Sequence, residues 1–437
     1  MKNKYALLFL LSLLLLTGCG DRVSNTVHEP SASSASDAVT SSSVTKSTVT
    51  TTKKATTTAA TTTKKPEPPE DLILSAPAAL EVYDEVKLSE FITDSNVDIL
   101  DGDTLIDTSE TGQAEVTVKY KHNNNIFEKK LTYNVVDTTP PVLLNSGWDP
   151  YHKTGTYFDL NEYVGFADNY DRNPILTYEG TVDPNTPGTY PLSVTATDSS
   201  GNQTSWETSI IVVDQLPVNT DNPEKYPFEQ FVSDCGGEGR RLGIDVSTWQ
   251  GSIDFNAVRD AGCEFVMIRI GYYYDHIVMD DCFKANLAGA RAAGLDVGIY
   301  FYTTDNTEEG VREHAAWIAE QLNGEPLDLP VAFDWEEFGN FQQYGMSIHD
   351  LNSLYGIFAE EMEKYGYKTM LYSSKNFLNN FWSENTKDST PVWLAHFVDE
   401  TDYEGNYAMW QKSALGRIPG IAGDVDLDVL YTDMPLN

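Results

Sequence analysis

Residues 329–337 of this 437-residue chain are Leu329-Pro330-Val331-Ala332-Phe333-Asp334-Trp335-Glu336-Glu337, an apolar run that ends abruptly in acids. Side chains two residues apart on a strand share a face, so Asp334 and Glu336 are predicted to point together, away from Phe333 and Trp335. The spacing alone is not specific, because 66 of the 437 residues are acidic. Acids that end a strand in solvent are one interpretation, and acids at the carboxyl end of a barrel strand, where such barrels hold their active sites, are the other.

The sequence around this run alternates strand patterns with helix patterns. The predicted strands are 241–246, 265–270, 297–302, 329–335, 369–372 and 392–395. The predicted helices are 255–261, 281–293, 307–322 and 347–365, and Gly262, Gly294 and Gly366 stand where helix C-caps are expected. This alternation predicts parallel strands in an α/β barrel of the TIM kind. Residues 397–407 are polar and too short for a crossover helix, so we expect an irregular barrel with a helix-poor final third.

Two further acids are predicted to join Asp334 and Glu336. Asp245 closes the first strand, and Asp426 lies in Val425-Asp426-Leu427-Asp428-Val429 near the end of the chain. In a closed barrel the first and last strands are neighbours, so four carboxylates could meet in one place. Mutual repulsion and partial burial would raise at least one pKa, as a general acid requires.

Aromatic residues gather at the same strand ends, and acids beside aromatic faces suit a polysaccharide, whose ring faces stack while its hydroxyls form hydrogen bonds. Tyr302 and Trp335 are expected to pack in the core. The predicted substrate-binding residues are Tyr300, Tyr272, Trp393, Trp410 and Trp249.

Five segments together resemble the glycoside hydrolase family 25 lysozymes in order and spacing. They are the run from Gly243 through Asp245, Trp249 and Gly251 to Asp254, then Phe265-Val266-Met267-Ile268-Arg269, Gly298-Ile299-Tyr300-Phe301-Tyr302, Asp334-Trp335-Glu336 and Val425-Asp426-Leu427-Asp428. The resemblance covers about 200 residues and leaves the N-terminal half unexplained.

This resemblance implies a secreted enzyme that hydrolyses the β-1,4 bond between N-acetylmuramic acid and N-acetylglucosamine in peptidoglycan. It implies Glu336 as the catalytic acid, Asp334 as its partner carboxylate, and Asp245 and Asp426 as supporting acids. Asp428 is a departure, because family members often have Asn there.

The stereochemical route stays open at this stage. Carboxyl groups about 5 to 5.5 Å apart favour retention and about 6.5 to 9.5 Å favour inversion. Two strand residues at this spacing have backbones about 6.6 Å apart, and rotamers could place the carboxyl groups in either class. A route in which the substrate's N-acetyl oxygen attacks, with Asp334 stabilising the cation, is a third, and net retention is preferred.

Two other functions compete with the lysozyme hypothesis. One is a non-catalytic glycan-binding surface lipoprotein, which the presence of both Glu336 and Asp334 disfavours. The other is a different glycosidase such as a chitinase, which the lack of carboxylates in residues 330–333 disfavours. Glycosidic hydrolysis needs acid, base and water, so no cofactor is expected, and no metal site is predicted because His314, His349 and His396 lack metal-ligand spacing.

The N-terminus has the order of an export signal, with Lys2 and Lys4 before an apolar stretch that is too short for a comfortable bilayer span. The segment Leu16-Thr17-Gly18-Cys19 resembles the bacterial lipobox, in which the cysteine is lipidated. This predicts a protein tethered to the extracellular face of the bacterial cell membrane, or held in the cell wall. Residues 24–69 are rich in Ser, Thr, Ala and Lys and are expected to form a disordered tether.

Two segments of the middle region end alike, in Val135-Val136-Asp137 and Val212-Val213-Asp214, which indicates an internal repeat of about 77 residues. In the second copy, residues 190–196 and 206–213 alternate around a turn and predict a hairpin. The motifs Asp137-Thr138-Thr139-Pro140-Pro141 and 195–202 resemble bacterial immunoglobulin-like surface repeats. A spacer role is favoured over wall or sugar binding.

The predicted fold class is therefore multidomain, with two all-β immunoglobulin-like sandwiches followed by the irregular TIM-like α/β barrel. A net charge of -37 argues against nucleic acid as a partner, because phosphate binding needs Lys and Arg. Of Cys235, Cys263 and Cys282, at most two can pair within one molecule. The predicted domains are the signal peptide and lipobox (1–19), a linker (20–70), two β-sandwich repeats (71–138 and 139–214), a connector (215–239) and the catalytic barrel (240–437).

Overall fold

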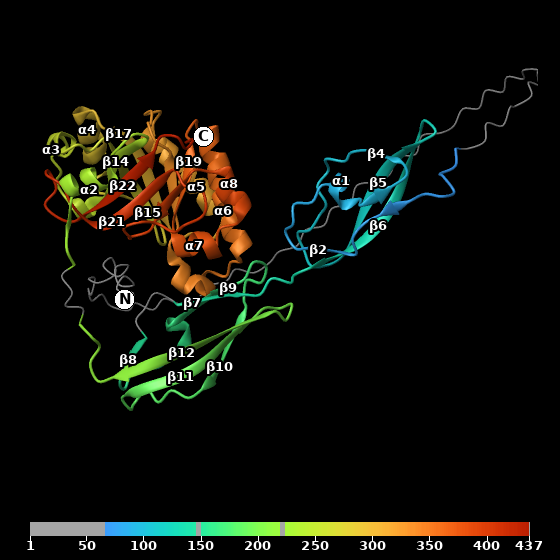
Figure 1. Cartoon of the computed structure of the whole chain (residues 1–437), viewed down its shortest axis with the longest axis horizontal. Helices are drawn as coiled ribbons and strands as arrows, with labels where there is room; N and C mark the ends of the chain where they lie inside the picture. The colour runs from blue at the N-terminus through green and yellow to red at the C-terminus, as the bar shows by residue number, and fades with distance from the viewer. Residues whose placement is uncertain (1–65, 146–149, 219–222, 437) are drawn as a thin grey trace, which may run out of the picture.

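The computed structural model describes residues 66–145, 150–218 and 223–436. The predicted signal peptide, the lipidation residue Cys19 and most of the predicted linker lie outside the described residues. The described chain forms two small β domains followed by a larger α/β body (Figure 1). In these ranges no helix combines the length and the apolar character that a membrane span requires.

The first β domain is built on a long hairpin, β5 with β6, whose strands are joined at Asn123 and Asn124. Both asparagines have positive φ, which suits the two-residue turns that connect antiparallel strands. Val118, Tyr133 and Phe91 are buried in its core. The elements are β1 (Leu74–Ser75), β2 (Ala79–Glu81), α1 (Leu88–Phe91), β3 (Asp94–Ser95), β4 (Asp98–Ile99), β5 (Gly112–His122) and β6 (Asn125–Val136).

The second β domain contains the predicted hairpin, now β11 and β12, paired from Gly188 with Val212 to Thr197 with Gln203. Leu192, Val194 and Ala196 point to one side and are buried, as their alternation predicts. The elements are β7 (Val142–Asn145), β8 (Tyr151–Lys153), the 3-10 helix η1 (Leu160–Glu162), β9 (Val164–Ala167), β10 (Ile175–Gly180), β11 (Gly188–Thr197) and β12 (Gln203–Val213).

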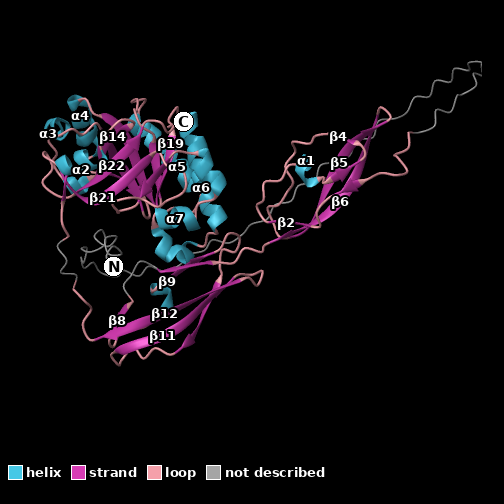
Figure 2. Cartoon of the chain, in the orientation of Figure 1, coloured by secondary structure: helices cyan, strands magenta, loops and turns pink. Residues whose placement is uncertain are grey.

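Both β domains consist mainly of strands and loops (Figure 2), and they share one topology. Their four-stranded sheets have the orders β2-β6-β5-β4 and β8-β12-β11-β10, and each domain adds a two-stranded sheet, β1-β3 or β7-β9. In each domain, the last strand pairs in parallel with a short early strand. The Val-Val-Asp segments at the ends of the two domains therefore occupy equivalent places in the fold. The internal repeat seen in the sequence is therefore a structural repeat.

Eight strands of the third body close into a barrel in the order β14-β15-β17-β18-β19-β20-β21-β22, with β22 returning to β14. All neighbouring pairs up to β21 are parallel, as predicted. The strands are β14 (Arg240–Val246), β15 (Phe265–Tyr273), β17 (Asp296–Thr303), β18 (Val331–Asp334), β19 (Thr369–Ser374), β20 (Val392–Ala395), β21 (Met409–Arg417) and β22 (Val425–Tyr431), with the short β16 (Ile277–Met279) paired to β15.

The helices cover the first two thirds of the barrel and end where the sequence places Gly262, Gly294 and Gly366, which all have positive φ. From β20 to β22 the described chain has no helix, which confirms the irregular barrel with a helix-poor final third. The helices are α3 (Phe255–Asp260), α4 (Phe283–Ala293), α5 (Glu308–Leu322), α6 (Ile348–Lys364), α7 (Lys375–Asn380) and α8 (Glu384–Ser389), with 3-10 helices η2 (Thr248–Gln250) and η3 (Glu337–Tyr344).

The last strand departs from the parallel pattern, because β22 is antiparallel to both β21 and β14. The connection from β21 to β22 is only a short loop, and a parallel pair needs a crossover of a dozen or more residues. Within the predicted connector, β13 (Tyr226–Pro227) pairs with β21 and α2 (Phe228–Cys235) buries Phe228 and Phe231 against the barrel.

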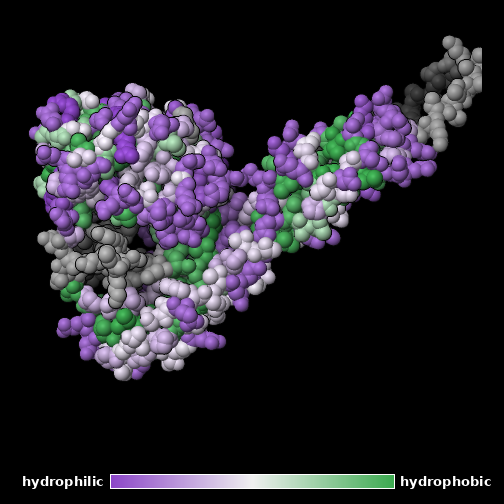
Figure 3. Space-filling view, viewed as in Figure 1, coloured by the Kyte–Doolittle hydropathy of each residue, from purple (hydrophilic) through white to green (hydrophobic). Residues whose placement is uncertain are grey.

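Alternation along the strands separates an inner core from an outer one. Phe265, Met267 and Met370 belong to the inner cluster, whereas Ile244 and Phe333 pack outward against the helices. Cys235, Cys263 and Cys282 all carry free thiols. The visible face of the barrel is mainly hydrophilic, and more hydrophobic surface lies along the first β domain (Figure 3).

The second β domain contacts the barrel through β9, which lies against η3. A Cβ on Gly165 of β9 would stand 3.1 Å from the carbonyl oxygen of Gly339 and 3.2 Å from that of Phe338. A glycine is therefore required for this close approach of the two backbones.

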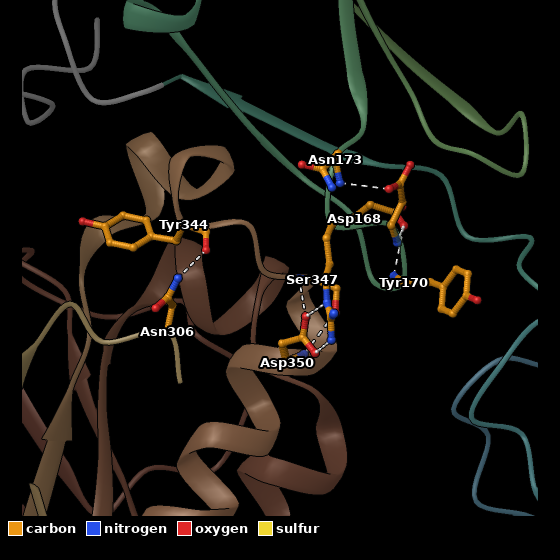
Figure 4. A network of polar contacts seen from close by, with 9 residues as sticks. Asp168, Tyr170, Asn173, Asn306, Tyr344, Ser347 and Asp350 are labelled. Carbon is orange, nitrogen blue, oxygen red and sulfur yellow. Dashed lines mark hydrogen bonds and ion pairs between the residues drawn. The ribbon is translucent and has the colours of Figure 1, made fainter. Parts of the chain in front are cut away.

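Polar contacts at the start of α6 complete this interface (Figure 4). Arg172 donates from Nε and Nη2 to the two carboxylate oxygens of Asp350, over 2.7 and 2.9 Å. The backbone N–H of Ile348 donates to the carbonyl oxygen of Asp168 over 2.8 Å. The paired geometry of the guanidinium fixes the orientation of the β domain as well as its position.

Substitution of two glycines, one just after a helix and one inside a helix, tests where the helices end. Gly294 caps α4 with φ 79° in open space, so Gly294→Ala costs only the left-handed backbone, about 1 kcal/mol. Gly356 lies inside α6, also in open space, so Gly356→Ala should stabilise the barrel by about 0.5–1 kcal/mol. Urea unfolding followed by tryptophan fluorescence measures both, and changes of the same sign would contradict the assignment.

Candidate active site

The predicted acids converge at the carboxyl ends of the parallel strands. Asp334 is the last residue of β18, and Asp245 of β14 pairs in register with Asp426 of β22. Each faces inward, because its neighbours Phe333, Ile244 and Leu427 pack in the outer core. Asp245 and Asp426, which are 181 positions apart in the chain, thus meet because the barrel closes.

Asp334 and Glu336 form the pair at the end of β18. Asp334 is 5% exposed and its Oδ1 accepts no hydrogen bond in the described structure, whereas Glu336 keeps some exposed surface where the chain turns into η3. Trp335 between them points into the core and donates from Nε1 to the carbonyl oxygen of Asp305 over 3.3 Å. Burial and then the charge of Glu336 raise the pKa of Asp334 well above its usual range.

Glu336 itself holds its proton more tightly than an ordinary glutamic acid. Burial raises the pKa of Glu336, the hydrogen bond with Asp334 lowers it, and the charge of Glu337 raises it again, with a net upward shift. Glu337 is held beside it, accepting a hydrogen bond from the hydroxyl of Tyr302 over 2.8 Å. A carboxyl group that stays protonated and reaches solvent has the properties of a general acid.

Asp245 is fixed by a buried chain of hydrogen bonds. The hydroxyl of Tyr372 donates to Oε1 of Gln411 over 2.9 Å, and Nε2 of Gln411 donates to Oδ2 of Asp245 over 2.8 Å. Burial raises the pKa of Asp245 to about 6, and the Gln411 amide opposes that rise. These two hydrogen bonds therefore orient the Asp245 carboxylate and determine which way the Gln411 amide faces.

Asp428 and Asp426 add further carboxyl groups beside Asp245. Asp428 has no exposed surface; its Oδ1 accepts from Nε1 of Trp393 over 2.9 Å, and its Oδ2 has no partner in the described structure. Burial and then the charge of Asp245 raise the pKa of both Asp428 and Asp426 well above the usual range. The residue that departs from the family pattern is thus part of the acid group.

One guanidinium balances part of this charge. Arg269 of β15 lowers the pKa of Asp245 and of Asp334, but it is also bound to Asp280, with Nε and Nη2 each 2.9 Å from the same carboxylate oxygen. Asp280 is in turn held by the backbone N–H of Thr248. The remaining carboxyl groups can lower their energy only by keeping protons.

The predicted aromatic residues fall into two sets. Trp249 of η2 is 69% exposed, and Tyr272 and Tyr300 retain partial exposure. Trp393 is buried at the inner core and Trp410 is buried in the outer core, where its Nε1 donates to the carbonyl oxygen of His396. Burial leaves Trp393 and Trp410 little free ring surface for a sugar.

Sequence reasoning did not single out several residues that the structure brings into this site. Gln411 lies in β21, where the sequence predicted no strand, and only the inward direction of Tyr372, at the end of a predicted strand, could be found from the pattern. Their hydrogen bond could not, because β19 and β21 are separated by another strand. Arg269 stands inside a quoted motif, but its link to Asp280 depends on the β15–β16 turn.

Closely spaced acidic oxygens, which could hold a metal ion, lie outside the barrel site. Among the described residues, the three acids whose carboxylate oxygens all lie within 4.8 Å of one another are Asp137, Asp168 and Asp198. They belong to the β domains and not to the barrel. Of the three histidines that lack metal-ligand spacing in the sequence, His314 is buried in the barrel, and burial lowers its pKa to about 4.

An α/β barrel with a pair of acids at a strand end has the arrangement of glycoside hydrolases. Comparison with known families agrees: residues 244–421 match Glycosyl hydrolases family 25, and residues 144–212 match the Bacterial surface protein, Ig-like domain. The second match covers the domain of β7 to β12 and confirms an immunoglobulin-like domain before the barrel.

Two curated relatives are lysozymes. The autolytic lysozyme of Clostridium acetobutylicum is 33% identical over 189 residues, which are 43% of this chain and 54% of that protein. Lysozyme M1 of Streptomyces globisporus is 31% identical over 214 residues, 46% of this chain and 70% of that protein. The chain thus spans about half the length of the first relative and over two thirds of the second.

A similar solved structure is the bacterial lysozyme from Streptomyces coelicolor, with 27% sequence identity, a TM-score of 0.38 and coverage of 43% of this chain and 90% of that one. The chain belongs to glycosyl hydrolases family 25. The resemblance drawn from the five sequence segments is confirmed.

Asp428 offers a stability test of the crowded acids. Its folded pKa lies above its unfolded value, so its contribution to stability is present at low pH and is lost as pH rises through the folded pKa. Asp428→Asn keeps the acceptor for Trp393 and removes the charge. We expect a gain of about 1–3 kcal/mol at about pH 7.5 and none at about pH 4.

Thermal unfolding of the full chain measures this difference, and Asp433→Asn, at an exposed acid beyond the same strand, is the matched control. The control should leave stability unchanged at both pH values. A loss of stability in Asp428→Asn at about pH 7.5 would show that neighbouring groups stabilise the charged form of Asp428 in the folded protein.

Proposed function

We propose that this chain is a lysozyme that hydrolyses the β-1,4 bond between N-acetylmuramic acid and N-acetylglucosamine in peptidoglycan. The observation that carries the proposal is the Asp334–Glu336 pair, which lies at the carboxyl end of a barrel strand with both pKa values raised. Membership of glycosyl hydrolases family 25 and the lysozyme names of two relatives support the substrate class.

Glu336 is assigned as the general acid. It is the more exposed member of the pair, so it can reach a glycosidic oxygen, and its raised pKa keeps the proton available for the leaving group. The proton moves from Glu336 to the glycosidic oxygen as the bond to the anomeric carbon breaks, and water later supplies the hydroxyl of the new reducing end.

Asp334 is assigned to the positive charge that develops at the anomeric carbon. Its free Oδ1 and its place beside Glu336 suit this role in any of the three routes. Asp245 and Asp426 act as supporting acids: their charge raises the pKa values of the group, and Gln411 holds Asp245 in place. No step of this chemistry needs a cofactor.

Sugar binding is assigned to the aromatic residues with free surface. Trp249 offers an exposed ring face, and Tyr272 and Tyr300 lie on the inner strands β15 and β17. Trp393 and Trp410 act through packing and hydrogen bonding, with Trp393 holding Asp428.

The N-terminal half is assigned two roles, which are to anchor the protein to the membrane and to hold the barrel at a distance from it. The proposed order is a signal peptide with lipidation at Cys19 (1–19), a linker (20–70), two immunoglobulin-like domains (71–138 and 139–214), a connector (215–239) and the catalytic barrel (240–437). The shared strand order of the two β domains supports an immunoglobulin-like first domain. The enzyme would then act from the extracellular face of the membrane, or in the cell wall.

Hydrolysis of purified peptidoglycan by the full chain tests the proposal. New reducing ends and fragment masses are measured for the wild type, for Glu336→Gln, and for Glu363→Gln, a matched change at an exposed acid of α6. The wild type and Glu363→Gln should release fragments that end in reducing N-acetylmuramic acid. Glu336→Gln should lose about 10²- to 10⁴-fold in rate, because the leaving group is no longer protonated.

The other outcomes separate the competing functions. Equal release by Glu336→Gln would move the acid to another residue. Binding to peptidoglycan without release by any variant would support a wall-binding protein. Fragments that end in reducing N-acetylglucosamine would indicate a different glycosidase.

A further inference from the structure

Three buried carboxylates meet where the two β domains join. Asp137 follows β6, Asp168 follows β9 and Asp198 follows β11, so three strand ends bring together residues from distant parts of the sequence. Their exposed fractions are 7%, 0% and 6%, and their oxygens lie within 4.8 Å of one another. Three acids in such a space repel each other strongly unless something neutralises them.

Hydrogen bonds orient these carboxylates but leave oxygens free. Oδ1 of Asp168 accepts from the backbone N–H groups of Tyr170 and Asp171 over 3.0 and 2.7 Å. Both oxygens of Asp198 accept from Asn202, over 2.8 Å each. Oδ2 of Asp168 and Oδ2 of Asp137 accept no well-formed hydrogen bond among the described residues, although both side chains are more than nine-tenths buried. Ser200 and Asn169 interact with the Asp137 carboxyl group and lower its pKa, but both are neutral and leave its charge uncompensated.

No cation of the described chain supplies the missing charge. In the described ranges, no ion pair involves Asp137, Asp168 or Asp198. Burial, together with the charges of Asp137 and Asp198, raises the pKa of Asp168 to about 6, although hydrogen bonds from two backbone N–H groups oppose the rise. A fourth oxygen is close by: the side chain of Asn169 interacts with Asp137, and its own Oδ1 is buried without a partner in the described structure.

We propose that Asp137, Asp168 and Asp198 bind a calcium ion. Carboxylate and amide oxygens are hard ligands, which calcium and magnesium prefer over softer metals. Calcium is favoured because it accepts an irregular set of protein oxygens, whereas magnesium requires an octahedron and keeps several waters, for which this buried space is poorly suited. The sequence predicts no metal site, so this proposal departs from that expectation.

The bound ion would tie together all three bodies of the chain. The carbonyl oxygen of Asp168 accepts from the N–H of Ile348 over 2.8 Å, and that of Asn169 accepts from the N–H of His349 over 3.3 Å. The ring of His349 stacks on Tyr83 of the first β domain, with centroids 3.5 Å apart. Neutralising the acids would therefore stabilise the junction of both β domains with the start of α6.

Calcium binding to the full chain tests the proposal. The chain is first stripped with a chelator and then titrated with calcium chloride in a calorimeter, and thermal unfolding is followed with and without calcium. Asp168→Asn removes one buried charge, and Glu179→Gln, at an exposed acid of β10, is the matched control for binding to an acidic surface. We expect one saturable site with a Kd of about 10⁻⁴–10⁻³ M or tighter in the wild type and the control.

Asp168→Asn should weaken that affinity at least tenfold. Without calcium it should unfold at an equal or higher temperature than the wild type, because a buried charge has gone, so lost binding is distinguishable from lost folding. With calcium, only the wild type and the control should gain stability.

The absence of saturable calcium binding in the wild type would overturn the proposal, as would unchanged affinity in Asp168→Asn. Equal affinity for magnesium would overturn the assignment to calcium. None of these readouts depends on peptidoglycan hydrolysis, so they are independent of the proposed function.

Discussion

The pairing of the first barrel strand with the last is the contact on which the site depends. β22 closes the ring by lying antiparallel to β14, and its register sets Asp245 opposite Asp426. That closure brings acids from both ends of the domain to the strand end that carries Asp334 and Glu336. Without it, the acids of β14 and β18 would face a sheet edge and water instead of one another.

The cost of this arrangement is negative charge in a space that excludes water. Arg269 offsets part of it, and Gln411 and Trp393 donate hydrogen bonds to Asp245 and Asp428. These donors do not compensate all of the negative charge, so some of the buried carboxyl groups keep their protons. The same burial of charge that destabilises the fold therefore keeps a proton on Glu336, the residue proposed as the general acid. A similar excess of buried carboxylates recurs at the junction of the β domains, where the proposed solution is a metal ion.

Local patterns predicted much of the barrel. Apolar runs located β14, β15 and β17 to β20, and glycines at 262, 294 and 366 marked helix ends, because these features depend on neighbours in sequence. Asp245, Asp334, Glu336 and Asp426 were found from their positions at strand ends. The hydrogen-bond chain through Gln411 and the cluster of Asp137, Asp168 and Asp198 were not. Their members lie about 30 or more residues apart, and only the tertiary pairing of strands brings them together.

Burial, together with the charge of Glu337, keeps the proton on Glu336. The most direct test is the pH dependence of kcat/KM for peptidoglycan hydrolysis by the wild type and by Glu337→Gln, since the charge of Glu337 raises the pKa of Glu336. The wild type should keep its activity to a pH above the usual glutamic acid range before it falls, and Glu337→Gln should fall at lower pH. An alkaline limb that does not move in the variant, or that lies at an ordinary glutamic acid pKa in the wild type, would show that neither burial nor the charge of Glu337 keeps the proton on Glu336.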